Sequence, residues 1–232
     1  MEMKQLTGVI DRTEQVALFR SVYLWVAMAL TITGLAALFV SSSFDMQALL
    51  FSSPASMIFL VVAELALVVY LTARIHRLSF TTATMLFILY SVLNGFMLSS
   101  VLLVYTAASV ASTFFITAGT FGTMCVVGYV TKKDLSTWGN LLMMFVLGLI
   151  VATVVNLFLH SSLMEWIISF IGIIVFSGLA AYDSQKIKQL LLTSGSEVDD
   201  SLRKIALLGA LSLYLDFINL FLYLLRIFGD RD

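Results

Sequence analysis

Long apolar runs separated by short polar segments make up most of this chain. A helix that crosses a bilayer needs about 20 mostly apolar residues, and seven runs of roughly that length can be followed along the sequence. They cover residues 19–40, 54–73, 80–105, 109–130, 141–159, 163–182 and 206–228. The connections are short, which predicts one seven-helix transmembrane domain over residues 1–232, with residues 1–18 as a short cytoplasmic N-terminal tail.

The composition supports a membrane protein. The chain is 60% hydrophobic and 12% charged, whereas an average soluble domain is roughly 45–50% apolar and about 25% charged. A soluble globular protein is therefore excluded, and the predicted fold class is an all-α integral membrane protein. The one cysteine and two separated histidines argue against a disulfide scaffold and a transition-metal site, and we expect no cofactor. The net charge of −1 argues against nucleic acid as a partner, because phosphate binding requires a basic patch.

Lysine and arginine residues are concentrated on one side of the predicted spans. Because cytoplasmic loops carry the excess of these residues, we expect a cytoplasmic N-terminus and an outer C-terminus. Arg226 and Arg231 fall on the outer side, and they would lie inside only if the last helix were re-entrant. The inner side receives Lys4, Arg12, Arg20, Arg74, Arg77, Lys132, Lys133, Lys186, Lys188, Arg203 and Lys204.

Carboxyl groups inside the apolar runs are the candidates for chemistry, because ionisable side chains in a bilayer are costly and often line an ion or proton path. Glu64 lies in the second run, Asp183 at the end of the sixth and Asp216 within the last. The helical rise places Asp216 roughly 12 Å and Asp183 roughly 5 Å from the cytoplasmic face. One face of the last helix also forms a polar seam, defined by Gly209, Ser212, Asp216, Asn219, Tyr223 and Arg226.

If Asp183 and Asp216 meet, they form a pair that shares a proton, because two adjacent buried carboxylates cannot both ionise cheaply. We interpret the pair as a pH-sensitive latch. When it is protonated, the pair holds the last two helices together. When it is deprotonated, the two carboxylates repel one another, and Arg74 becomes an available counter-charge. Two alternatives remain open. Asp183 simply ends its helix at the interface near Lys186 and Lys188, or the polar seam is only a hydrogen-bonded packing face.

Several segments resemble the Bax inhibitor-1 (TMBIM) family, and most closely its bacterial branch. They are AYDSQKIK at 181–188, LYLDFINLF at 213–221, LLRIFG at 224–229, NGFMLSS at 94–100 and KKDLS at 132–136. The resemblance implies six helices around a central seventh helix and a pH-dependent calcium leak in a bacterial inner membrane. It implies that Asp183 and Asp216 are the pH sensor and weak ligands of calcium. In some members an arginine near the inner end of the second helix pairs with these aspartates. Counted without gaps from Glu64, the matching position in this chain is Ile75, one residue after Arg74.

Two further residues are expected along an ion path, Glu64 and Asn219, although Glu64 is equally explained as a protonated packing residue. Ca²⁺ prefers six to eight oxygen ligands, so two or three carboxylates hold it only weakly. Weak binding is compatible with a leak, because the ion must be able to leave its site. The resemblance also implies an alternative function, regulation of a membrane-bound AAA protease or another membrane partner, with the N-terminal tail as the contact. An intramembrane aspartyl protease is disfavoured because Gly-x-Gly-Asp is absent before Asp216, and we expect no enzyme.

Overall fold

The computed structural model describes residues 12–193 and 200–231. This part of the chain is helical, and seven of its helices are long and apolar enough to cross a membrane, as predicted. The helices are α1 (Arg12–Ser42), α2 (Phe44–Phe51), α3 (Pro54–Arg74), α4 (Phe80–Val104), α5 (Ala107–Val130), α6 (Ser136–Leu159), α7 (Ser162–Thr193) and α8 (Asp200–Phe228), with a 3₁₀ turn, η1, at Ile75–Arg77.

The helices differ from the predicted runs at three places. The helix α1 begins at Arg12, so the part of the predicted tail within the described residues is helical; residues 1–11 lie outside them. The short helix α2 was not predicted at all. The helix α7 continues ten residues beyond Asp183, which therefore lies inside the helix and does not end it. The interpretation of Asp183 as a helix terminus is thus incorrect.

Local chemistry explains where α3 and α4 start. Ser53 accepts a hydrogen bond from the backbone N–H of Ser56, and Pro54 occupies the first turn, where the N–H that it lacks has no helical partner. Ser79 caps α4 in the same way by accepting from the N–H of Thr82. After the last turn of α6, His160 adopts a left-handed conformation with φ of 51°, and the chain reverses into α7.

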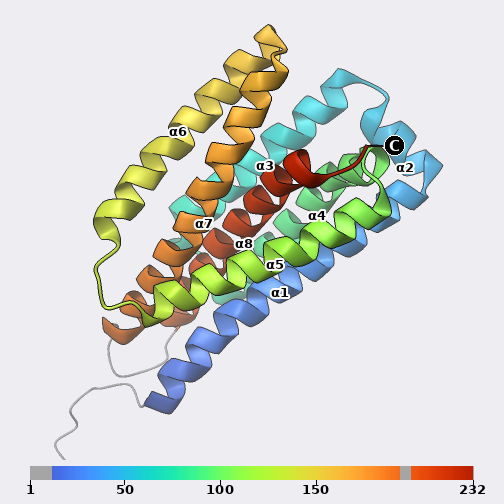
Figure 1. Ribbon diagram of the computed structural model, residues 1–232. Helices are drawn as coiled ribbons and strands as arrows, with labels where there is room; N and C mark the ends of the chain where they lie inside the picture. The colour runs from blue at the N-terminus through green and yellow to red at the C-terminus, as the bar shows by residue number, and fades with distance from the viewer. Residues whose placement is uncertain (1–11, 194–199, 232) are drawn as a thin grey trace, which may run out of the picture.

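The last helix lies in the middle of the bundle, as expected (Figure 1). Of its most apolar stretch 61% is buried, against 11% for α3 and 6% for α6. The helices α1, α4, α5 and α7 pack directly on α8, whereas α3 packs chiefly on α4 and α6 packs on α7. The architecture is therefore a five-helix core with α3 and α6 as outer helices.

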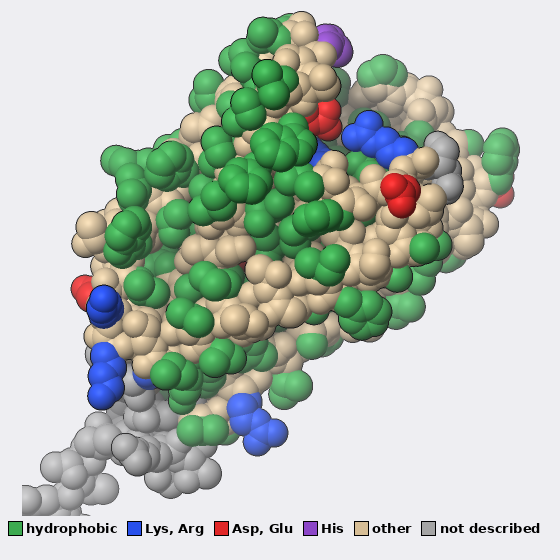
Figure 2. All heavy atoms as spheres, viewed as in Figure 1, with side chains coloured by type: hydrophobic (Ala, Val, Ile, Leu, Met, Phe, Trp, Pro, Cys, Tyr) green, Lys and Arg blue, Asp and Glu red, His purple; other side chains and the backbone are tan. Residues whose placement is uncertain are grey.

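The side chains sort by polarity along the bundle. Figure 2 shows hydrophobic side chains over most of the visible sides, with lysine and arginine side chains near the end where α1 begins. We call this the basic end; it holds Arg74 and the loop that carries Lys132 and Lys133. The opposite end, which holds residue 231, is the C-terminal end. Because α8 runs unbroken between the two ends, the re-entrant alternative for the last helix is wrong.

Candidate functional site

The polar seam of α8 lies along α7. A Cβ atom on Gly209 would lie 2.7 Å from the Ile187 side chain, and the Tyr223 ring fills the space beside Gly172. The two helices therefore approach closely near both ends of the seam. Asp216, midway along it, is brought close enough to Asp183 of α7 for their charges to interact. The two aspartates therefore lie on adjacent helices, within electrostatic range of one another, and their sharing of a proton stays a prediction.

Asp216 is almost fully enclosed, with 5% of its surface exposed. Its Oδ2 atom is buried and accepts no hydrogen bond from the described residues. A carboxyl group in such a place must be neutral, paired with a cation or hydrated. Asp183 is half-buried, and the ammonium group of Lys186 acts electrostatically on it. The two carboxyl groups therefore share one site but differ in their access to a counter-charge.

A set of hydrogen bonds holds α7 next to Asp183. The Ser184 hydroxyl lies 3.0 Å from the Tyr23 hydroxyl of α1, and it donates a 2.8 Å hydrogen bond to the Cys125 carbonyl of α5. On the same helix face, Gly128 allows α5 to touch the backbone of Ala181. These partners position Asp183 from two helices that are distant in sequence. These contacts were not predicted from the sequence, where the one available signal was the position of Ser184 inside the AYDSQKIK segment.

Gln185 connects two of the segments that resemble the Bax inhibitor family. Its Oε1 atom accepts from the Leu135 backbone N–H, and its Nε2 atom donates to the Lys133 carbonyl, both at 2.8 Å. The KKDLS loop is thereby attached directly to the turn of α7 that carries Asp183. Gln185 was not predicted as part of the site either, because a polar side chain after an apolar run suggests a helix that is leaving the membrane.

The remaining predicted site residues lie away from the aspartate pair or are already engaged. Arg74 is exposed at the end of α3 and forms no salt bridge with a described carboxylate. The Asn219 amide nitrogen donates to the Leu215 carbonyl of its own helix. Glu64 is half-buried, with a buried Oε1 that has no partner among the described residues, and it lies near Tyr90 and Tyr214. The latch and ion-path roles of these residues stay predictions.

The donor set suits only a weakly held cation. Within the described residues, no three His, Cys, Asp or Glu side chains gather in a way that could hold a metal ion. Two carboxyl groups supply at most four of the six to eight oxygens that Ca²⁺ prefers. The aspartate pair therefore does not form a tight calcium cage with the described residues.

Comparisons with known proteins agree with the motifs. The family model described as "Inhibitor of apoptosis-promoting Bax1" matches residues 15–232. The chain is 50% identical over 214 residues to the inner membrane protein YbhL of Escherichia coli strain K12, covering 90% of each chain. It is 40% identical over 234 residues to an uncharacterised protein of Deinococcus radiodurans, covering 99% of this chain and 98% of the other. The matched region includes both aspartates and every helix that packs around them.

Proposed function

Because this chain belongs to the Bax inhibitor-1 family, we propose that it is a pH-sensitive calcium leak whose gate is the proton-sharing pair Asp183 and Asp216. The observation that carries the proposal is the burial of Asp216, with an unpartnered oxygen, beside a second carboxyl group. A structural carboxylate in a bilayer is normally paired with a cation or fully hydrogen-bonded. This one has neither partner in the described structure.

The pair links protonation to the contact between α7 and α8. With one shared proton, the two carboxyl groups hydrogen-bond and hold the helices together. When the proton leaves, two negative charges repel in a medium of low dielectric constant, and the contact between the helices loosens. The same charges attract Ca²⁺ weakly, which allows the ion to leave again. Arg74, at the basic end, is the predicted counter-charge of the opened state.

The proposed membrane is the bacterial inner membrane, in keeping with the name of the Escherichia coli relative. The basic end faces the cytoplasm because the excess of lysine and arginine marks the cytoplasmic side. Asp183 and Asp216 then lie in the cytoplasmic half of the bundle, where a change in cytoplasmic pH reaches them. The proposal includes no catalytic step.

The test is calcium flux into liposomes that contain the purified chain, followed with an entrapped calcium-sensitive dye while the pH is varied. We expect flux to increase with pH in the wild type and to lose its pH response in the double variant Asp183→Asn with Asp216→Asn. The matched control is Asp45→Asn, which removes an exposed carboxyl group in α2 and should leave the profile unchanged.

Two outcomes would overturn the proposal. If the double variant keeps both the flux and its pH response, the pair is not the sensor. If the wild type passes no calcium but inhibits a co-purified membrane protease, the chain regulates a partner instead.

A further inference from the structure

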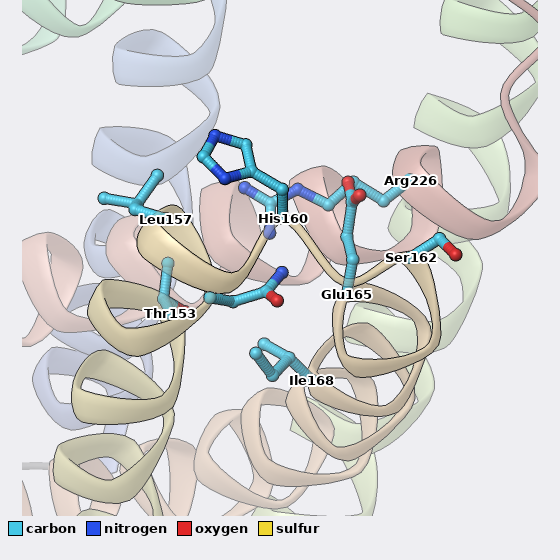
Figure 3. Close-up of a pocket in the computed structure, with 8 residues that line it drawn as sticks. Thr153, Leu157, His160, Ser162, Glu165, Ile168 and Arg226 are labelled. Atoms are coloured by element: carbon cyan, nitrogen blue, oxygen red, sulfur yellow. The ribbon is translucent and has the colours of Figure 1, made fainter.

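A polar pocket opens at the C-terminal end, and Figure 3 shows the residues that line it. It has a volume of about 350 Å³ and lies between the end of α6, the start of α7 and the end of α8. Its polar lining consists of Thr153, Asn156, His160, Ser162, Glu165 and Arg226. The proposed function uses none of these residues, although Arg226 belongs to the polar seam.

Arg226 presents an un-neutralised positive charge to this pocket. Its guanidinium lies over the Tyr223 ring, 5.5 Å from the ring centre. That ring is itself fixed, because it stacks on Phe176 at 5.8 Å and fills the space beside Gly172. The nearby carboxylate of Glu165 forms its salt bridge with Arg231 at 3.6 Å, and no described carboxylate pairs with Arg226. The arginine is therefore held in place but remains free to bind an anion.

Other groups around the pocket also favour an anion. The Asn156 Oδ1 atom accepts a hydrogen bond from the Ser161 backbone N–H, which leaves the amide N–H groups of Asn156 as donors. The first turn of α7 starts at Ser162, and the amino end of a helix carries a partial positive charge. In Figure 3 the Arg226 side chain extends from α8 toward His160 at the end of α6. Arginine in such a setting is well suited to a phosphate group.

An apolar groove adjoins the pocket. It also has a volume of about 350 Å³, runs between α6 and α7, and shares the side chain of Ile168 with the pocket. Its wall is open at Gly148, where an added Cβ atom would meet no other atom within 4 Å. The remaining lining is almost entirely apolar and includes Phe145, Leu149, Ala152, Met164 and Ile171. A charged pocket joined to an apolar groove at the rim of a membrane bundle matches the two parts of a phospholipid.

We propose that this site binds an aminophospholipid from the surrounding leaflet. The phosphodiester lies against Arg226, the ammonium group of the headgroup lies beside the Glu165 carboxylate, and one acyl chain occupies the groove at Gly148. Glu165 decides the headgroup class, because its carboxylate attracts the ammonium group, whereas the glycerol headgroup of phosphatidylglycerol brings no cation to it and cardiolipin brings a second, negatively charged phosphate. The lipid thereby adds to the direct packing of the outer helix α6 on α7.

The experiment measures lipid binding by native mass spectrometry of the delipidated full chain in detergent. Three probes are titrated: phosphatidylethanolamine, phosphatidylglycerol, and glycerophosphoethanolamine, which has the headgroup without acyl chains. We expect phosphatidylethanolamine to bind most tightly. Arg226→Gln should weaken it on the order of tenfold, the usual effect of losing one hydrogen-bonded charge contact. Arg77→Gln at the basic end is the matched control and should change nothing.

A second variant tests the groove separately. Gly148→Leu fills it without a clash in the bundle, so it should weaken phosphatidylethanolamine but leave glycerophosphoethanolamine unchanged. Gly119→Leu, at another glycine whose added Cβ atom would meet no atom within 4 Å, is the control. Glu165→Gln should remove the preference for the amine headgroup over phosphatidylglycerol.

Three results would each overturn the proposal. The first is equal binding of phosphatidylethanolamine to the wild type and to Arg226→Gln. The second is binding of glycerophosphoethanolamine as tightly as the lipid, which would mean a site for free anions only. The third is unchanged lipid binding in Gly148→Leu. None of these readouts depends on calcium flux, so the proposed function and the lipid site can fail independently.

Discussion

Replacing Gly128 with alanine should separate α5 from α7 and weaken the whole bundle. A Cβ atom at this position would lie 2.7 Å from the carbonyl carbon of Ala181 and closer still to its oxygen. Ordinary van der Waals contact begins at 3.4 Å, so the carbonyl carbon alone requires α7 to move by about 0.7 Å and the closer oxygen requires more. The atoms in the way belong to the helix backbone, which cannot change rotamer to make room.

The cost follows from this displacement. Forcing one extra carbon into a packed contact typically costs about 1–3 kcal/mol. The movement also stretches the 2.8 Å hydrogen bond from Ser184 to the Cys125 carbonyl, which contributes about 1 kcal/mol. We therefore expect Gly128→Ala to lower the free energy of unfolding by about 2–4 kcal/mol. Because the same contact places Asp183 beside Asp216, the pH response of calcium flux should also weaken.

The measurement is unfolding in detergent, followed by the fluorescence of Trp25, Trp138 and Trp166. Gly122→Ala on the same helix is the control, since its new Cβ atom would meet no other atom within 4 Å. It should be neutral or stabilise by up to about 1 kcal/mol, because alanine favours a helix more than glycine does. If Gly128→Ala unfolds at the wild-type midpoint or above it, the close contact between α5 and α7 is not the one described here.

Two further predictions concern polar groups outside the aspartate pair. Tyr214→Phe removes a buried 2.7 Å hydrogen bond to Thr33, whose hydroxyl still donates to the Ser91 carbonyl; the free energy of unfolding should fall by about 1 kcal/mol in the same assay. Hydrogen bonds from the hydroxyl and backbone N–H of Ser136 lower the pKa of Asp134 below its usual value. The ionised carboxylate of Asp134 therefore stabilises the folded state. This stabilisation is fully present above the unfolded pKa of about 4, and it is lost as the pH falls through the lower pKa of the folded state. Asp134→Asn should reduce the Tm at pH 7 but match the wild type in strong acid, and a constant difference at all pH values would contradict this reasoning.

The number and order of the transmembrane helices could be predicted because every helix that crosses lipid needs a long apolar run of its own. Each run can be recognised from its own residues, without knowledge of the helices that pack on it. The short helix α2 could not be predicted in this way. None of its residues is buried, and Ser43 caps it by accepting from the Met46 backbone N–H. It lies between the runs at 19–40 and 54–73 and has only 8 residues, so a search for runs long enough to cross a bilayer does not find it.

The end of α7 was misplaced for a different reason. Ser184 and Gln185 are polar, which suggests a chain that has left the membrane, yet both are buried. They are tolerated because Cys125 and the loop before α6 satisfy their hydrogen bonds. Such partners come from helices that are distant in sequence, and a single sequence does not specify which helices will pack together.

The burial of Asp216 could be predicted, because a carboxyl group within an apolar run stays inside the bundle whichever helices surround it. The seam on α8 also followed from helical periodicity, and Gly209 and Tyr223 do face α7. The position of Arg74 was not predictable from depth alone. It lies at the basic end, but rotation of α3 about its axis decides whether its side chain faces the core, and the structure leaves that side chain exposed.

The distribution of buried polar side chains limits where an ion can pass. Within the described residues, the buried polar side chains lie on α1, α4, α5, α7 and α8, whereas α3 and α6 contribute none. They are Thr33, Ser91, Asn94, Ser99, Ser109, Thr113, Thr117, Ser169, Ser184, Gln185 and Asp216. A cation in transit needs oxygen ligands to replace its water, so a path through the bundle must run within these five helices. Glu64 lies at the edge of that core, whereas Asp216 lies on its central helix and is almost fully buried. We therefore predict that Asp216, rather than Glu64, controls passage in the proposed leak.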